Sequence, residues 1–288
     1  MILLEKLFQN NQQLQKWKFN RSLSIQHSQQ KKQYAQLLKI LMEKKIHTFF
    51  QPIISVIDGK TIGYEALNRP IKTKIFSSTE QFYHFLGDTD QVFQFEKLTR
   101  QQSIEKYVEQ KSQDNYGNKD FIFLNVHPHV LNDANYKSGK TLRFIEEHGL
   151  DPRQIVFEIT EKQAVQDYSQ FERVLNNYRS QGFKIAIDDV GAGYNSLKTM
   201  MYMKPDFIKL DRSFIQNIDK ELAKQKLVHL FAQYASQSES LVIAEGVERW
   251  EELQFLKAIK VDYAQGYYIG RPSENLMRPL ESAKIVNY

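Results

Sequence analysis

Hydrophobic residues occur from residue 47 onward in short runs that alternate with longer amphipathic stretches. The segments 166–181, 219–237 and 249–259 carry apolar residues at helical spacing. Strand-then-helix repetition is typical of a mostly parallel sheet with helices outside. About eight strands over roughly 240 residues match a closed (β/α)₈ barrel in size. The strand-like runs are HTFFQPIISV, TIGYEALNR, FIFLNV, QIVFEIT, FKIAIDD, DFIKLD, SLVIAEG and VDYAQGYYI.

The link between the first two runs is too short for a regular barrel. Only Asp58-Gly59-Lys60 and their neighbours separate the runs, and Asp-Gly is a strong turn signal. Parallel neighbours need a crossover of a dozen or more residues. The sequence therefore predicts an α/β fold, a modified TIM (β/α)₈ barrel with one antiparallel strand near the start.

The chain before the first run has a different character. Residues 1–32 are polar and rich in Gln and Asn, which predicts a helical or partly ordered segment. Residues 33–46 have apolar residues at helical spacing, so we expect a helix there. No break in composition divides 33–288, which we take as one barrel domain, and we expect the polar stretch 110–119 to be a loop. The apolar positions of 219–237, namely Leu222, Leu227, Leu230 and Phe231, are expected in the core.

Composition and charge narrow the function classes. The chain has no cysteine, which excludes disulfides, thiolate metal sites and a cysteine nucleophile, and fits a cytoplasmic protein. No stretch approaches the length of apolar sequence that spans a bilayer. The net charge of +5 comes from dispersed lysines, which favours ordinary solvated surface over a DNA-binding face.

Polar residues stand where the apolar runs end. In a parallel barrel the carboxyl ends of the strands open onto one face, so these side chains should meet around one mouth. We expect five acids at this mouth, Glu65, Glu158, Asp188, Asp189 and Glu245, and like-charged carboxylates cannot all stay ionised at close range without compensation. Oxygen ligands suit hard ions such as Mg²⁺ or Mn²⁺, and Lys209 adds one positive charge. The residues are Glu65, Asn125, Glu158, Asp188, Asp189, Asp211, Glu245 and Gln265.

The adjacent pair Asp188 and Asp189 requires a change of backbone direction. Neighbouring residues on a regular strand point to opposite faces, so both can reach one metal site only if the chain leaves the strand there. Gly191 and Gly193 follow closely and permit a turn. Two ions about 3.5–4 Å apart are a known device for phosphate ester hydrolysis. This pattern predicts a metal-dependent phosphoesterase and leaves its substrate open.

An ordered series of motifs resembles the EAL-domain family of cyclic di-GMP phosphodiesterases over roughly residues 33–288. Glu65-Ala66-Leu67 is the signature that names the family, and Arg69 follows it. The other matching segments are FQPI at 50–53, FLNVHP around Asn125, FEITE at 157–161, DDVGAGYNSL at 188–197, IKLD at 208–211, IAEGVE at 243–248 and QGYYIGRP at 265–272.

The resemblance implies hydrolysis of cyclic di-GMP to linear pGpG with two Mg²⁺ or Mn²⁺ ions. One ion would be held by Glu65, Asn125, Glu158 and Asp188, and the second by Asp188, Asp189 and Glu245. Glu245 would also be the general base, Lys209 would contact the attacking water and Gln265 would position groups near it. The same resemblance assigns substrate contacts to Gln51, Leu67, Arg69 and Pro272, and supporting roles to Glu161 and Asp211.

Several expectations remain open at this point. Val190 and Ala192 stand where the family commonly has Phe and Thr, in a loop that the family couples to dimer contacts, so we expect a homodimer with an altered loop. The chain has no room for a partner cyclase (GGDEF) domain, so a stand-alone EAL domain is expected. Two alternatives are a cyclic di-GMP receptor without catalysis and a phosphoesterase for another substrate. A turnover assay paired with calorimetry would distinguish a receptor from an active enzyme. A panel of substrates would distinguish a phosphoesterase for another substrate.

Overall fold

A computed structural model of the chain describes residues 28–113, 120–126, 139–160, 168–191 and 196–279. The chain divides into two units. One unit contains residues 1–46 and 70–91, and the other contains 47–69 and 92–288. The predicted boundary between residues 32 and 33 stays a prediction, because most of the first segment lies outside the described residues.

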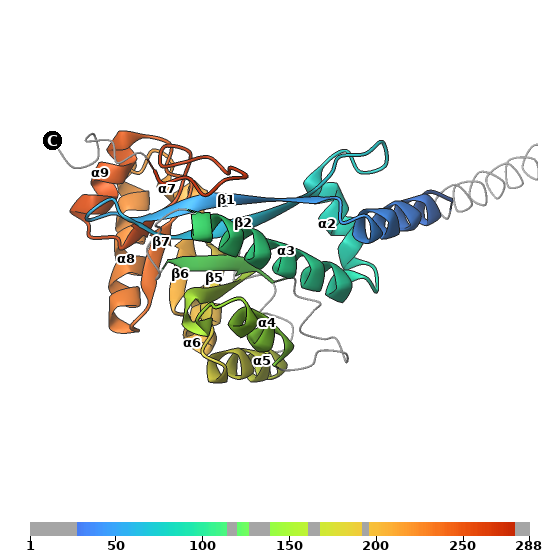
Figure 1. Cartoon of the computed structure of the whole chain (residues 1–288). Helices are drawn as coiled ribbons and strands as arrows, with labels where there is room; N and C mark the ends of the chain where they lie inside the picture. Colours follow the sequence, from blue (N-terminus) through green and yellow to red (C-terminus); the bar gives the residue numbers. More distant parts are fainter. Residues whose placement is uncertain (1–27, 114–119, 127–138, 161–167, 192–195, 280–288) are drawn as a thin grey trace, which may run out of the picture. The chain divides into compact units, whose positions relative to one another are not determined.

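The larger unit is built on a closed barrel of eight strands in sequence order (Figure 1). Strands β2 to β8 pair in parallel, whereas β1 pairs with β8 in the antiparallel direction. A tight turn with Gly59 at φ +70° joins β1 to β2, as the Asp-Gly signal predicted. The strands are β1 Ile46–Ser55, β2 Thr61–Pro70, β3 Phe121–Asn125, β4 Ile155–Thr160, β5 Lys184–Val190, β6 Phe207–Leu210, β7 Leu241–Ala244 and β8 Tyr263–Ala264. The modified barrel is therefore confirmed.

Side chains from successive strands fill the barrel. One buried cluster contains Ile53, Phe123, Val156, Ala186, Phe207 and Ile243, each from a different strand. The rings of Phe123 and Phe207 meet edge to face at 5.2 Å. Because strand residues alternate between faces, their neighbours point outward and form a second cluster with the helices. Phe157 of β4, for example, packs on Tyr178 with ring centroids 4.5 Å apart.

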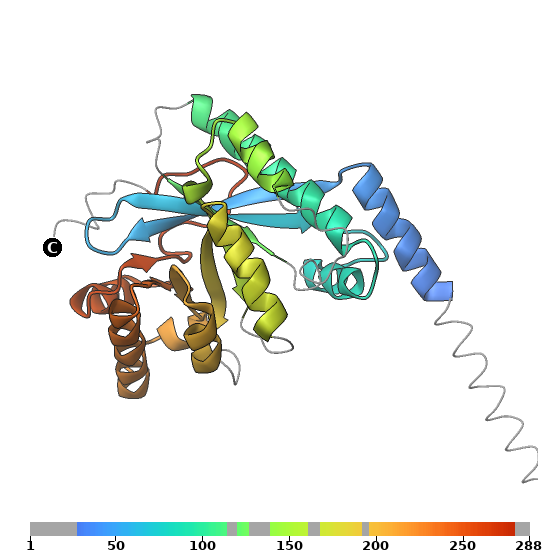
Figure 2. The ribbon, with the colours of Figure 1, turned by 90° about the horizontal axis from the view of Figure 1, so that it is seen from below.

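Helices surround the strands of this unit (Figure 2). Each connects one strand to the next, which is the arrangement expected for a parallel barrel. They are α3 Val92–Gln113, α4 Lys140–Glu147, α5 Tyr168–Ser180, α6 Ser196–Met203, α7 Arg212–Ile215, α8 Leu222–Gln237 and α9 Trp250–Ala258, with a 3₁₀ turn at Pro152–Gln154.

Three expectations about these elements need correction. Leu222, Leu227 and Leu230 of α8 are exposed rather than buried, and the buried stripe is Val228, Phe231 and Ala235. Residues 110–113 belong to α3 instead of a loop. The run 261–269 yields a strand of only two residues, and just beyond it Gly266 passes so close to Val247 that a Cβ there would lie 2.1 Å from the Val247 backbone oxygen.

The smaller unit holds a helix over residues 28–42 and helix α2, Thr79–Gly87. The first helix ends four residues before the predicted end, because the backbone turns at Lys44, which has a φ of +49°, and β1 begins at Ile46. The Tyr34 hydroxyl donates to the Asp90 carboxylate at 2.8 Å, and Phe76 packs edge to face on Phe82. A groove of about 1100 Å³ lies between the two helices.

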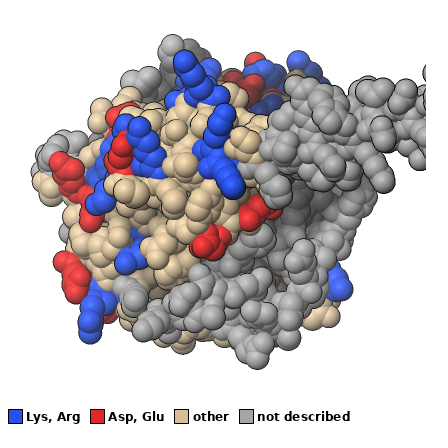
Figure 3. All heavy atoms as spheres, turned by 90° about the vertical axis from the view of Figure 1, so that its right-hand side faces the viewer, with Lys and Arg blue, Asp and Glu red and all other residues tan. Residues whose placement is uncertain are grey.

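No helix in the described part of the chain is both long and apolar enough to cross a membrane. On the face drawn in Figure 3, Lys and Arg side chains are interspersed with Asp and Glu. Mixed charges of this kind are ordinary protein surface.

Candidate active site

Four carboxylates from different strands converge on the ammonium group of Lys209. Its Nζ atom lies 2.6 Å from Glu158 Oε1, 2.8 Å from Glu245 Oε1, 3.1 Å from Asp188 Oδ1 and 3.4 Å from Glu65 Oε2. Glu65 is on β2, Glu158 on β4, Asp188 on β5 and Lys209 on β6, while Glu245 follows the last residue of β7. The prediction that the strand ends bring these residues to one place is therefore confirmed.

Amide side chains hold the carboxylate of Glu65 from two sides. Gln265 Nε2 donates to Glu65 Oε2 at 2.8 Å, and Asn125 Nδ2 donates to Glu65 Oε1 at 3.1 Å. Gln265 also donates to Gln51 Oε1 at 3.2 Å, and Gln51 in turn donates to the backbone oxygen of Gly270 at 3.0 Å. Gln51, Glu65, Asn125 and Gln265 thus form one connected network beside Lys209.

The backbone leaves the strand at Asp189, as the adjacent acids require. Asp189 has a φ of +57°, and the pairing of β5 with β6 shifts register between Ile187 and Val190. As a result Asp188, Asp189 and Glu245 each place an oxygen within 4.8 Å of the others. The turn therefore lies at Asp189 itself, and Gly191 continues it with a φ of +103°.

Burial and mutual repulsion shift the pKa values of this cluster. Burial raises the pKa of Glu245 to about 8, and the charges of Asp188 and Glu65 add to the effect, although Lys209 opposes it. Burial also raises the pKa of Glu158 well above its usual range, helped by the charge of Glu65. Burial alone would lower the pKa of Lys209, but the surrounding carboxylates raise it well above its usual value.

Glu65 behaves differently from the other two glutamates. Burial alone would raise its pKa, but the Lys209 charge and the hydrogen bonds from Gln265 and Asn125 together lower it. Three hydrogen-bond or ion-pair donors therefore keep Glu65 ionised, while its negative charge favours the protonated form of Glu158 and Glu245. One ammonium group neutralises only part of the negative charge that four carboxylates can carry. The cluster therefore favours the binding of protons or further cations.

The donor set fits hard divalent cations. Glu158 Oε2 is buried and has no hydrogen-bond partner among the described residues, which is costly unless a cation or proton occupies that side. The remaining donors of the cluster are also oxygens, the ligand type that Mg²⁺ and Mn²⁺ prefer. The residues that could hold ions are Glu65, Asn125, Glu158, Asp188, Asp189 and Glu245.

Of the predicted substrate contacts, Gln51 belongs to the hydrogen-bonded network beside Lys209, and the others lie on β2 and on the segment after β8. Arg69 is exposed at the end of β2, with its guanidinium 5.0 Å from the centroid of the Phe49 ring, and Leu67 and Pro272 are half-buried. Asp211 is the N-cap of α7 and accepts from the Ser213 amide at 2.9 Å. Glu161 and Ala192 lie outside the described residues.

Sequence reasoning missed the side chains that pack behind the acids. Phe214 and Arg212 of α7 lie directly against Gly191 and Gly246, where a Cβ atom would come within 1.6 Å of Phe214 and 2.4 Å of Arg212. Gly246 follows Glu245 immediately, and Gly191 follows the Asp pair by two residues. A glycine this close to one of the predicted site acids was the available signal for such packing.

Comparison with known proteins places the barrel in a family. The chain is 33% identical over 130 residues to the cyclic di-GMP phosphodiesterase PdeF of Escherichia coli (strain K12), covering 45% of this chain and 17% of that protein. A standalone EAL protein from Vibrio cholerae O395, solved with c-di-GMP bound, matches with a TM-score of 0.68 and 27% identity over 81% of this chain and 94% of that one.

A second solved structure, the EAL enzyme Bd1971 with cAMP and cyclic di-GMP, has a TM-score of 0.77 at 24% identity. The match covers 85% of this chain and 66% of the Bd1971 chain, and at this identity it supports the fold alone. The match spans only 16% to 27% of the length of PdeF and three other curated relatives. The family model described as EAL domain matches residues 34–272. The chain therefore belongs to the EAL domain family.

Proposed function

We propose that this chain hydrolyses cyclic di-GMP to linear pGpG with the help of two divalent ions, Mg²⁺ or Mn²⁺. The observation that carries the proposal is the convergence of Glu65, Glu158, Asp188 and Glu245 on Lys209. The name of the PdeF relative and the bound nucleotide of the Vibrio cholerae protein support the substrate.

Each ion would be held by oxygen ligands from the mouth of the barrel. Glu65, Glu158, Asp188 and the carbonyl of Asn125 are assigned to one ion, and Asp188, Asp189 and Glu245 to the other. The close approach of oxygens from Asp188, Asp189 and Glu245 supports the second set. When bound, the ions would lower the pKa of a water molecule and offset charge on the phosphodiester.

The residues of the chain supply the remaining steps. Glu245 accepts the proton of the attacking water, and its Oε1 atom lies 2.8 Å from Lys209 Nζ, the group proposed to hold that water. Lys209 holds that water, and Gln265 orients Glu65 through its hydrogen bond. Arg69 binds a substrate phosphate, which its exposed guanidinium is suited to do. Gln51, Leu67 and Pro272 line the nucleotide site, and Glu161 and Asp211 support the neighbouring loops.

The test is turnover by purified protein with Mg²⁺ or Mn²⁺. We expect conversion of cyclic di-GMP to pGpG, and we expect Glu245→Gln to abolish turnover while the nucleotide still binds, because Gln cannot accept the proton. A wild-type protein that binds both ions and the nucleotide yet never cleaves it would contradict the proposal and favour a receptor.

The proposal extends to assembly and location. Met201 and Tyr202 are 66% and 56% exposed on α6, the helix that follows the Asp pair, and such exposed apolar side chains suit a homodimer interface. Light scattering should therefore report a dimer, and Tyr202→Glu should shift it toward monomer. A chain with no cysteine that acts on an intracellular second messenger is also consistent with a cytoplasmic protein.

A further inference from the structure

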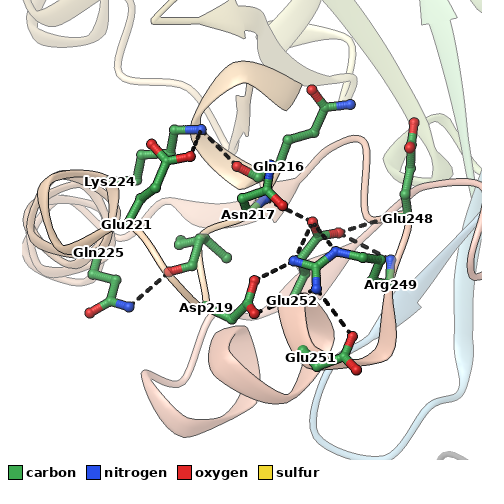
Figure 4. A network of polar contacts seen from close by, with 11 residues as sticks. Gln216, Asn217, Asp219, Glu221, Lys224, Gln225, Glu248, Arg249, Glu251 and Glu252 are labelled. Carbon is green, nitrogen blue, oxygen red and sulfur yellow. Dashed lines mark hydrogen bonds and ion pairs between the residues drawn. The ribbon is translucent and has the colours of Figure 1, made fainter.

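The carboxylate of Glu252, in the first turn of α9, is almost fully buried and accepts hydrogen bonds from three backbone amides. Its Oε2 atom accepts from Glu248 N at 2.9 Å and from Arg249 N at 3.1 Å, and its Oε1 atom accepts from Asn217 N at 2.8 Å (Figure 4). Its exposed fraction is 2%. The first two bonds cap α9, but the third reaches another segment, so Glu252 is more than a helix cap.

The three amides belong to the two segments that follow Lys209 and Glu245. Asn217 lies just beyond α7, which begins three residues after Lys209, and Glu248 and Arg249 lie three and four residues after Glu245. The Arg249 guanidinium strengthens the same link, because it pairs with Asp219 and contacts Glu252 Oε1 at 3.1 Å (Figure 4). Glu252 and Arg249 therefore tie the segment after β6 to the segment after β7.

Helix α7, which the Asn217 bond anchors at its carboxyl end, touches both acid-bearing loops. Gly246, next to Glu245, leaves no room for a Cβ beside Arg212, and Gly191, next to Val190, leaves none beside Phe214. The backbone continues the contact, since Glu245 N donates to Leu210 O and Asp211 N donates to Val190 O, both at 3.1 Å. A shift of α7 would therefore move Glu245 and the Asp pair relative to Lys209.

We propose that Glu252 is a positioning residue, which sets the spacing of Glu245, Asp188 and Lys209 through Asn217 and α7. The inference rests on the proposed function in one respect: the positioned oxygens bind divalent ions. Ion sites tolerate errors of only about 0.5 Å in ligand position. A buried carboxylate with both oxygens engaged by backbone amides holds two loops more rigidly than solvated contacts would.

The test compares Glu252→Gln with Glu251→Gln in the full chain. A glutamine at 252 has one acceptor oxygen, so it cannot serve Asn217 and α9 together, and its NH₂ group would face an N–H donor. Glu251 is the matched control, because its side chain is exposed and contacts Arg249 Nη1 at 3.3 Å but neither loop backbone. Mn²⁺ affinity by calorimetry, amide exchange at Asn217 and turnover of cyclic di-GMP are measured at one temperature.

We expect Glu252→Gln to weaken Mn²⁺ binding about tenfold. It should also speed exchange at Asn217 and lower kcat at saturating Mn²⁺, with KM for the nucleotide within about twofold of wild type. Glu251→Gln should match wild type in all of these. If Glu252→Gln lowers the Tm and speeds exchange while Mn²⁺ affinity stays unchanged, Glu252 is only a helix cap and the inference is wrong.

The design separates this inference from the proposed function. A wild type that binds Mn²⁺ without turning over cyclic di-GMP contradicts the proposed function, and the affinity comparison still decides the role of Glu252. A wild type that binds no Mn²⁺ overturns both. If Glu252→Gln does not fold, Arg249→Gln replaces it, because it keeps the backbone amide and releases the guanidinium. For Arg249→Gln, a loss of Mn²⁺ affinity smaller than the one expected for Glu252→Gln supports the inference, and an unchanged affinity overturns it.

Discussion

Lys209 is the residue whose replacement should change the cluster most. Without its ammonium, four carboxylates at the mouth lose their partner, and breaking a buried ion pair typically costs about 3–5 kcal/mol. We expect Lys209→Met to lower the free energy of unfolding by about 3 kcal/mol at pH 7 in a chelator. Added Mg²⁺ should restore part of the loss, because it supplies positive charge at the same oxygens. Urea unfolding with and without Mg²⁺ measures both effects.

Lys184 offers a matched control for this variant. It pairs with Asp206 at 2.8 Å, and both side chains are about one-third exposed, so solvent screens the pair. Exposed pairs contribute about 0–1 kcal/mol, and Lys184→Met should stay in that range with no response to Mg²⁺. Equal losses in the two variants would show that the four carboxylates are not specially dependent on Lys209.

Sequence reasoning identified most residues of this site but not their contacts. Acids at the ends of parallel strands must share one face, so Glu65, Glu158, Asp188 and Glu245 could be grouped without coordinates. The central place of Lys209 could not be predicted, since it depends on side-chain lengths and burial. Nor could the positive φ of Asp189, because the sequence permits a turn at Gly191 equally well.

The loop after β7 should not tolerate a side chain at Gly246. Gly246 and Gly149 have φ values of +71° and +70°, so alanine should cost about 1–3 kcal/mol of backbone strain at either position. Only Gly246 faces a neighbour, since its Cβ would lie 2.4 Å from that of Arg212, whereas nothing lies within 4 Å at Gly149. Gly246→Ala should therefore lower the Tm further and also weaken Mn²⁺ binding. Gly149→Ala should change only the Tm, and weaker Mn²⁺ binding there would contradict this reading.

Helix α8 shows why periodicity alone misassigned a buried face. Its sequence contains two apolar stripes at helical spacing, and only contact with the barrel decides that Val228, Phe231 and Ala235 face inward. We expect Phe231→Ala to lower the free energy of unfolding by roughly 3 kcal/mol, as buried aromatic deletions do. Leu230→Lys on the exposed stripe should change it by less than about 0.5 kcal/mol. A large loss for Leu230→Lys in chemical unfolding would show that this stripe is covered in solution.

At the scale of the whole molecule, the barrel was predictable because many local signals agree. Strand-helix alternation set the class, and the short Asp-Gly link required one antiparallel strand. The shortness of β8 was not predictable, because the length of a strand depends on its pairing with β1 and β7, which only the closed barrel brings beside it. Strand boundaries elsewhere agree to within two residues, since β-branched runs end at polar residues.

The acid cluster should make the stability of the whole molecule depend on pH and on divalent ions. The folded state raises the pKa of Glu245 to about 8, against 4.5 for the free group, so folding favours its protonated form. The contribution of Glu245 to the free energy of unfolding is therefore fully present below pH 4.5 and is lost as the pH rises toward 8. In a chelator at pH 8, Glu245→Gln should therefore be more stable than wild type, on the order of 2 kcal/mol.

Divalent ions should make the wild-type protein more stable than Glu245→Gln, the reverse of the order expected in a chelator. A cation favours the ionised carboxylate and stabilises the folded state in proportion to its binding, so saturating Mg²⁺ should raise the wild-type Tm at pH 8. Glu245→Gln should gain less, because it has lost one ligand. Glu248→Gln, an exposed acid three residues away, should follow wild type throughout. Thermal unfolding from pH 5 to 8, with and without Mg²⁺, tests both expectations. If the Tm of wild type and of Glu245→Gln changed in parallel with pH in the chelator, Glu245 would titrate normally. The repulsion among the carboxylates around Lys209 would then be relieved by some other group.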